Sequence, residues 1–159
     1  MKLTILCVGK LKEDPERALV ARYLERFGQI GAGLGFGAAS VTEIAESRAL
    51  TSSERKTAEA AELKRRVGEA RIVALDERGR GLTSEEFAYL LRDWRDAGIR
   101  STAFVLGGPD GLDSGFAKEA YLALSLGRLT MPHGLARVVL AEQVYRAATI
   151  LARHPYHRA

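Results

Sequence analysis

The chain has 159 residues, 47% of them hydrophobic and 28% charged, so it is long and apolar enough for one domain with a sizeable core, and wholesale disorder is excluded. Its single cysteine, Cys7, excludes an internal disulfide framework and a cysteine-rich zinc site, and favours a reducing compartment. Cys7 lies in an apolar run and is expected to be an inert core residue. We therefore expect one cytoplasmic domain over residues 1–159, without a membrane span or targeting segment.

The net charge of +4 comes entirely from the carboxyl-terminal part of the chain. Residues 1–126 carry 19 Lys and Arg against 19 Asp and Glu, which cancel. Residues 127–159 carry five arginines against the single acid Glu142, and also all three histidines. A basic end of this kind favours a phosphate-rich partner. A solvated tail explains the same asymmetry, so charge alone leaves both possibilities open.

The first part of the chain predicts a strand, a helix and a glycine-rich connection. Lys2–Val8 is a nearly continuous apolar run, which is typical of a strand buried on both faces. Residues 15–27 have apolar side chains at helical spacing, with Asp14 as the predicted N-cap and Gly28 as the predicted end. The tract 28–37 lacks the spacing of a dinucleotide fingerprint or a phosphate loop, so we predict a flexible connection there.

The rest of the chain continues the alternation of strands and helices, and two of the helices begin with a Thr-x-x-Glu capping box. The predicted elements are a weak strand at 40–44, a helix capped by Thr51 and Glu54 that reaches about Val67, a strand at 71–76, a helix capped by Thr83 and Glu86 that ends at Gly98, a strand at 101–106, a short helix from about Ser114, a strand at 121–126 and a helix at 135–152. Because parallel neighbours need helical crossovers, this order predicts the α/β fold class, with a mostly parallel sheet flanked by helices.

Three glycine-bearing loops follow predicted strands: ERGRG after 71–76, GGPDG after 101–106 and GRLTMPHG after 121–126. In open parallel sheets the ligand crevice lies beyond the carboxyl ends of the strands, so these loops are the candidate site. They contain no GxSxG elbow, no Cys-His pair and no HExxH, and the HxxH of His154 and His157 lacks further ligands for a metal. A site rich in backbone donors and acceptors suits an organic cofactor that brings its own reactive group.

Several stretches of the sequence are more specific: MKLTILCVGK at the start, VLGGPDG at 105–111, LSLGRLTMPHGLARVVLAEQVYRA at 124–147 and HPYHR at 154–158. With these stretches the chain resembles, from end to end, the ribosomal RNA large subunit methyltransferase H family, a minimal branch of the SPOUT superfamily of knotted methyltransferases. Only the glycine tract 28–37 looks unusual. The resemblance implies an S-adenosylmethionine-dependent methyltransferase that modifies N3 of a pseudouridine in 23S rRNA. It further implies a homodimer and a carboxyl-terminal trefoil knot, with no membrane or DNA partner.

The resemblance also implies which residues bind the cofactor, whereas the RNA surface and the base are inferred from charge and residue chemistry. Those expected to bind S-adenosylmethionine, largely through their backbone, are Leu75, Gly107, Leu126, Gly127, Arg128, Leu129, Thr130 and Met131. The basic tail is the available RNA surface, with candidate residues Arg153, His154, Tyr156 and Arg158, and with Arg137 and Arg146 as further candidates. His157 is the candidate general base, although an arginine-stabilised N3 anion would need none. We expect that the tail of one protomer can complete its partner's pocket.

Two other functions compete with this hypothesis. The first is a non-catalytic RNA-binding protein that uses the basic tail and never binds the cofactor. The second is a nucleotide-dependent enzyme of the ordinary doubly wound type, which the absence of both phosphate-loop signatures disfavours. The sequence leaves open whether the substrate is naked rRNA, the large subunit or the assembled ribosome.

Overall fold

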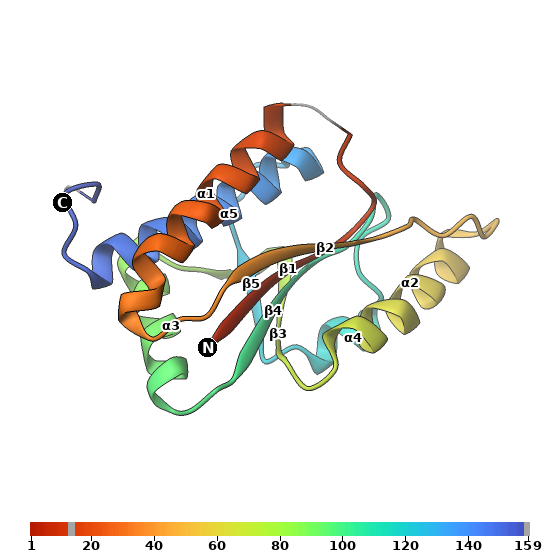
Figure 1. Cartoon of the computed structure of the whole chain (residues 1–159). Coiled ribbons are helices and arrows are strands. Elements are labelled where there is room, and N and C mark those ends of the chain that lie inside the picture. The colour runs from red at the N-terminus through yellow and green to blue at the C-terminus, as the bar shows by residue number, and fades with distance from the viewer. Residues whose placement is uncertain (13–14, 158–159) are drawn as a thin grey trace.

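The computed structural model describes residues 1–12 and 15–157, and it places five parallel strands in one sheet with helices on both faces (Figure 1). The elements, in chain order, are β1 (Lys2–Val8), α1 (Pro15–Gly31), the 3-10 helix η1 (Ala32–Leu34), β2 (Ala39–Ile44), α2 (Ser52–Val67), β3 (Arg71–Gly81), α3 (Ser84–Asp96), β4 (Ser101–Leu106), α4 (Ser114–Glu119), β5 (Leu122–Ser125) and α5 (His133–Leu151). The strand order is β2-β1-β4-β3-β5, and all four neighbouring pairs are parallel. The predicted fold class is confirmed.

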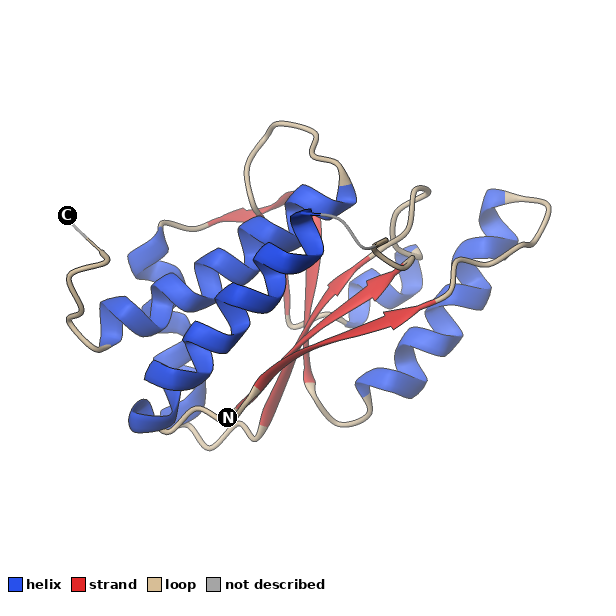
Figure 2. Ribbon diagram, turned by 45° about the horizontal axis from the view of Figure 1, so that its top comes forward, coloured by secondary structure: helices blue, strands red, loops and turns tan. Residues whose placement is uncertain are grey.

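Two helical layers of unequal size cover the sheet (Figure 2). α1, α3 and α5 pack against one another on one face, over the larger core, which contains Phe27, Trp94 and Phe104. α2 and α4 cover the other face, over a smaller core around Leu63 and Phe116. Trp94 is therefore a core residue, as predicted. Within the described residues, no helix combines the length and the apolar character needed to cross a bilayer.

Several local predictions are confirmed. Both capping boxes are present. The Thr51 and Thr83 side chains each accept the third backbone N–H of the helix that follows, and the glutamate side chain at that third position accepts the backbone N–H of the threonine. Cys7 lies in β1 and is fully buried, and burial raises the pKa of its thiol to about 12. The thiol is therefore neutral and inaccessible, as expected of an inert core residue. The predicted N-cap Asp14 lies outside the described residues.

The glycine tract after α1 differs from its prediction. α1 continues through Gly28 to Gly31, and η1 then adds a turn that ends at Gly35, whose φ of +79° favours glycine. Gly31 lies against the ring of Phe27, and Phe36 donates its N–H to the Gly31 carbonyl at 2.9 Å. The Phe27 and Phe36 rings meet edge to face, with 5.7 Å between centroids. This aromatic packing outweighs the low helix propensity of glycine. The local sequence pattern does not reveal such packing, because the two rings are nine residues apart.

We expect Gly28→Ala to stabilise the protein. A Cβ at Gly28 would have no atom within 4 Å, and alanine is preferred to glycine inside a helix, so the free energy of unfolding should rise by roughly 0.5–1 kcal/mol. Urea denaturation measures the change. Gly31→Ala is the control, because its Cβ would lie 3.2 Å from the Phe27 ring and should gain less. A destabilised Gly28→Ala variant would contradict the placement of Gly28 within α1.

β3 is longer than predicted, because the ERGRG stretch belongs to the strand and is not a loop. Leu75 and Arg80 both pair with Leu124 of β5, so residues 76–79 bulge out of the ladder. The Ser125 hydroxyl donates to the Glu77 carbonyl at 3.1 Å and holds the bulge. A sequence pattern shows the glycines but not the pairing partner, so the bulge was mistaken for a turn. α5 also begins two residues earlier than predicted, at His133 after Pro132.

Candidate functional site

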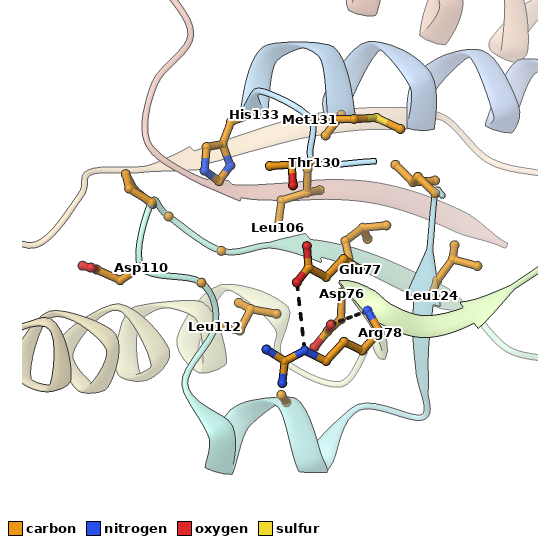
Figure 3. Close-up of a pocket in the computed structure, with 18 of the residues that line it drawn as sticks. Asp76, Glu77, Arg78, Leu106, Asp110, Leu112, Leu124, Thr130, Met131 and His133 are labelled. Carbon is orange, nitrogen blue, oxygen red and sulfur yellow. Dashed lines mark hydrogen bonds and ion pairs between the residues drawn. The ribbon is translucent and has the colours of Figure 1, made fainter. Parts of the chain in front are cut away.

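The bulge within β3 and the segments that follow β4 and β5 meet around one cavity of about 680 Å³ (Figure 3). It is lined from residues 75–78, 106–112 and 124–131, and further by Lys56, Ser114, Ala117, His133 and Ala136. The predicted crevice is therefore confirmed for the loops after β4 and β5, whereas ERGRG contributes only Glu77 and Arg78, from within β3. The volume lies within the range of about 300–1,000 Å³ that is usual for small-molecule sites.

The GGPDG loop after β4 closes tightly on itself. The Gly111 N–H donates to the Gly108 carbonyl at 2.9 Å, and Gly111 has a φ of +82°. A Cβ on Gly107 would lie 2.6 Å from the carbonyl carbon of Gly111 and 2.7 Å from the Leu112 nitrogen. Gly107 is therefore required for the loop to close. A side chain at this position would therefore obstruct the loop itself.

The start of α5 is fixed by a buried ion pair. Arg137 is 2% exposed, and its Nη1 lies 2.7 Å from the Oε1 of Glu43 on β2. Its Nη2 donates to the carbonyls of Val8 and Gly9 at 3.0 and 2.9 Å. The same Glu43 oxygen accepts the Leu11 N–H at 2.8 Å. The prediction that Arg137 contacts RNA is therefore wrong, because its guanidinium joins α5 to the carboxyl ends of β1 and β2.

Most of the predicted cofactor residues come together in the cavity. The lining includes Leu75, Gly107, Leu126, Gly127, Leu129, Thr130 and Met131. Arg128 is exposed and is not among the lining residues. Apolar side chains therefore cover much of the cavity, and glycine backbone forms part of its wall. Leu106 and Leu124 also line the cavity and were not among the predicted residues.

A charged part of the lining was missed by sequence reasoning. It consists of Asp76, Glu77, Arg78 and Asp110 (Figure 3), together with Lys56 of α2. The Arg55 guanidinium, which donates to Asp110 at 2.6 Å, lowers the pKa of that carboxyl. Asp110 belongs to the GGPDG motif, so the motif was the signal that could have identified it as a lining residue. Lys56 gave no signal, because a lysine on a charged helix has the pattern of a solvated face.

The carboxyl-terminal tail folds back on its own chain. The Tyr156 hydroxyl donates to Glu142 Oε1 at 3.0 Å, and its ring lies 4.7 Å from that of Tyr145, centroid to centroid. Burial and the Glu142 contact together raise the pKa of Tyr156 to about 12. Arg146 pairs with Glu142 at 2.7 Å within α5 and lies over the Tyr156 ring. Arg146, a candidate for phosphate contact, is thus already paired with an acidic residue of its own helix.

The other predicted tail residues also lie outside the cavity. His157 Nε2 is 3.7 Å from Glu85 Oε1, and the Arg153 and His154 side chains are exposed. Arg158 lies outside the described residues. Tyr156 contacts Glu142 in the middle of α5, whereas the cavity is lined by His133 and Ala136 at the start of that helix, nine and six positions earlier. Within one chain, the described part of the tail, residues 152–157, does not line the cavity.

Comparison with known proteins adds to this geometry. The family model described as "Predicted SPOUT methyltransferase" matches residues 1–157. A protein named ribosomal RNA large subunit methyltransferase H from Rhodopseudomonas palustris (strain BisB5) is 49% identical, with 100% of both chains covered. One of the same name from Bradyrhizobium diazoefficiens is 50% identical at the same coverage. The crystal structure of a probable methyltransferase from Bordetella pertussis Tohama I has a similar fold, with a TM-score of 0.52 and 14% identity over 92% of this chain and 95% of that chain.

Proposed function

Because the chain belongs to the SPOUT methyltransferase family, we propose that it transfers the methyl group of S-adenosylmethionine to N3 of a pseudouridine in 23S rRNA. The observation that carries this proposal is the cavity formed by the bulge of β3 and the segments after β4 and β5. The names of the full-length relatives support rRNA of the large subunit as the substrate class. The proposal treats residues 1–159 as one cytoplasmic domain with a trefoil knot at its carboxyl-terminal end.

The lining of the cavity fits S-adenosylmethionine. Backbone N–H and C=O groups of the GGPDG loop and of residues 126–131 suit the polar edge of an adenine, and Leu75 and Met131 offer apolar surface for its faces. The charged residues on the other part of the lining suit the amino and carboxylate groups of the methionine end. Both chemical halves of the cofactor therefore find a matching surface in one cavity of adequate volume.

Methyl transfer of this kind requires mainly that the enzyme position its two reactants. The cofactor supplies an electrophilic methyl group on its sulfonium. The chain then has to orient the two reactants in line and assist loss of the N3 proton, and it needs no covalent nucleophile. The cavity suits this requirement, because the GGPDG loop in its wall is closed by the bond from Gly111 to Gly108. His157, the predicted base, can serve this step only if the tail of another protomer brings it to the cavity.

We include in the proposal a homodimer in which each tail completes the partner's cavity. None of the described tail residues 152–157 is among those that line the cavity of the same chain, and this supports the arrangement. Arg153, His154, Tyr156 and Arg158 would then contact rRNA next to the bound cofactor, through phosphate contacts and base stacking. The packing of Tyr156 against Glu142 and Tyr145 would present the tail in a fixed direction.

Mixed dimers test whether the tail acts on the partner. One protomer carries Gly107→Ala, which disables its cavity, and the other carries His157→Ala with Arg158→Ala, which disables its tail. We expect each homodimer to be inactive and the purified heterodimer to regain activity, because it pairs one intact cavity with the tail of the other protomer. An inactive heterodimer, or a fully active monomer, would contradict the arrangement.

Methylation with labelled S-adenosylmethionine tests the function itself. Assembled ribosomes, isolated large subunits and naked rRNA are compared as substrates, and the modified base is then mapped. We expect label at N3 of one pseudouridine of 23S rRNA. Label on protein or DNA would overturn the substrate class. No heat on calorimetric titration with S-adenosylmethionine, and no competition by its demethylated product, would favour the non-catalytic RNA-binding protein.

A further inference from the structure

Arg55 holds the GGPDG loop from outside the cavity. It lies in the first turns of α2, and its Nε donates to Asp110 Oδ2 at 2.6 Å. Its Nη1 donates to the carbonyls of Ala49 and Leu50 at 3.1 and 3.2 Å. Asp110 lines the cavity, whereas Arg55 is not among the lining residues. One guanidinium therefore ties the cavity loop to both α2 and the segment that leads into it.

The Arg55 contact is suited to fixing a loop. Both side chains of the pair are about 30% exposed, so the pair is partly shielded from water. The contact lowers the pKa of Asp110 and raises that of Arg55, so both groups stay charged at neutral pH. The planar guanidinium satisfies a carboxylate and two carbonyls at once, which a lysine ammonium does with less directional control.

A second contact from α2 supports the same loop. Glu59, one turn after Arg55, is 6% exposed and accepts the Ser47 N–H at 2.9 Å. A Cβ added to Gly108 would lie 3.4 Å from Glu59 Oε2, so this carboxylate lies directly beside the loop. α2 thus contacts the loop at both Gly108 and Asp110, while the loop's own closure depends on the bond from Gly111 to Gly108.

We propose that Arg55 is a positioning residue, which keeps the GGPDG loop in its cofactor-binding conformation through Asp110 and so sets the affinity for S-adenosylmethionine. The inference rests on the proposed function. A loop that is closed only part of the time lowers the apparent affinity by the fraction that is closed. Without Arg55, the loop opens more often, so binding weakens although no group that lines the cavity has been removed.

The chain offers a closely matched control pair. Lys64 lies on the same helix, and its Nζ contacts Glu119 Oε1 at 2.5 Å. Both pairs join α2 to a residue 55 positions further along the chain. The Lys64 pair joins α2 to α4 and is about half exposed, and neither of its residues is among those that line the cavity. Lys64→Gln therefore removes the same charge from the same helix without releasing the loop.

The experiment compares Arg55→Gln, Asp110→Asn, the double variant and Lys64→Gln with the wild-type protein. Calorimetric titration with S-adenosylmethionine gives Kd, and urea denaturation checks that each variant is folded. In the cofactor-free protein, amide hydrogen exchange at Gly111 reports loop opening, because this N–H is bonded to Gly108 only in the closed loop. Exchange therefore tests the loop without depending on activity or on the cofactor.

We expect Arg55→Gln to raise Kd roughly tenfold and to accelerate exchange at Gly111, and we expect the double variant to match Asp110→Asn alone, because Arg55 acts through Asp110. Lys64→Gln should match the wild-type protein in Kd and in exchange. Unchanged Kd and exchange in Arg55→Gln, or an equal effect in Lys64→Gln, would overturn the inference alone. Failure of the wild-type protein to bind S-adenosylmethionine would instead overturn the proposed function, and this inference with it.

Discussion

Replacing Gly107 by alanine is expected to abolish S-adenosylmethionine binding while the sheet remains folded. The added Cβ would lie 2.6 Å from the Gly111 carbonyl carbon and 2.7 Å from the Leu112 nitrogen, which is closer than a real Cβ approaches backbone. The loop must shift to relieve both contacts, and the shift displaces the wall of the cavity. Because displacements of about 1 Å cost roughly 100-fold at such sites, Kd should rise by at least about that factor.

Calorimetric titration measures the effect of Gly107→Ala, and circular dichroism checks its fold. Gly28→Ala is the matched control, since it adds the same methyl group where nothing lies within 4 Å, and it should bind the cofactor as the wild-type protein does. Wild-type affinity in the Gly107→Ala variant would show that the loop is not part of the cofactor site.

Replacing Arg137 by methionine is expected to cost about 3–5 kcal/mol of the free energy of unfolding. The change leaves the Glu43 side chain, which is only 14% exposed, without its main partner, and it leaves the Val8 and Gly9 carbonyls without the Arg137 donor. Urea denaturation measures the loss. Cofactor binding should weaken as well, because Ala136 and His133, which line the cavity, belong to the turns that Arg137 fixes.

The double variant Arg137→Met with Glu43→Gln separates the ion pair from the volume of the side chains. It should be destabilised by less than the sum of the two single variants, since the unpaired carboxylate is then gone. An Arg137→Met protein within about 0.5 kcal/mol of wild type, the range of ordinary surface substitutions, would contradict the burial and pairing described for this residue.

Elements with local signals could be predicted from the sequence, and those that depend on a distant partner could not. β1 and β4 follow from apolar runs, and α2 and α3 follow from capping boxes, because these signals act within a few residues. The end of α1 was misplaced, since Phe36 packs on Phe27 across the glycine tract. The bulge in β3 is equally invisible in the sequence, since it depends on the register with β5.

The same distinction holds for the site. The rule for parallel sheets and the family resemblance together located the apolar and backbone lining, such as Leu75 and Gly107. The contribution of α2 was missed, because Lys56 and Arg55 lie more than fifty residues from the loop they approach. Arg137 was assigned to RNA on charge alone, and its buried partners on β1 and β2 could not be inferred from composition.

The most direct test of the cofactor site is a titration of isotopically labelled protein with S-adenosylmethionine, followed by the amide signals in nuclear magnetic resonance spectra. We predict saturation at one cofactor per chain, with the largest shifts at residues 75–78, 106–112 and 126–131. A second cavity of about 490 Å³, lined from residues 81–87 and 139–143 among others, provides an internal comparison. Shifts centred on that cavity, or no shifts at all, would contradict the assignment.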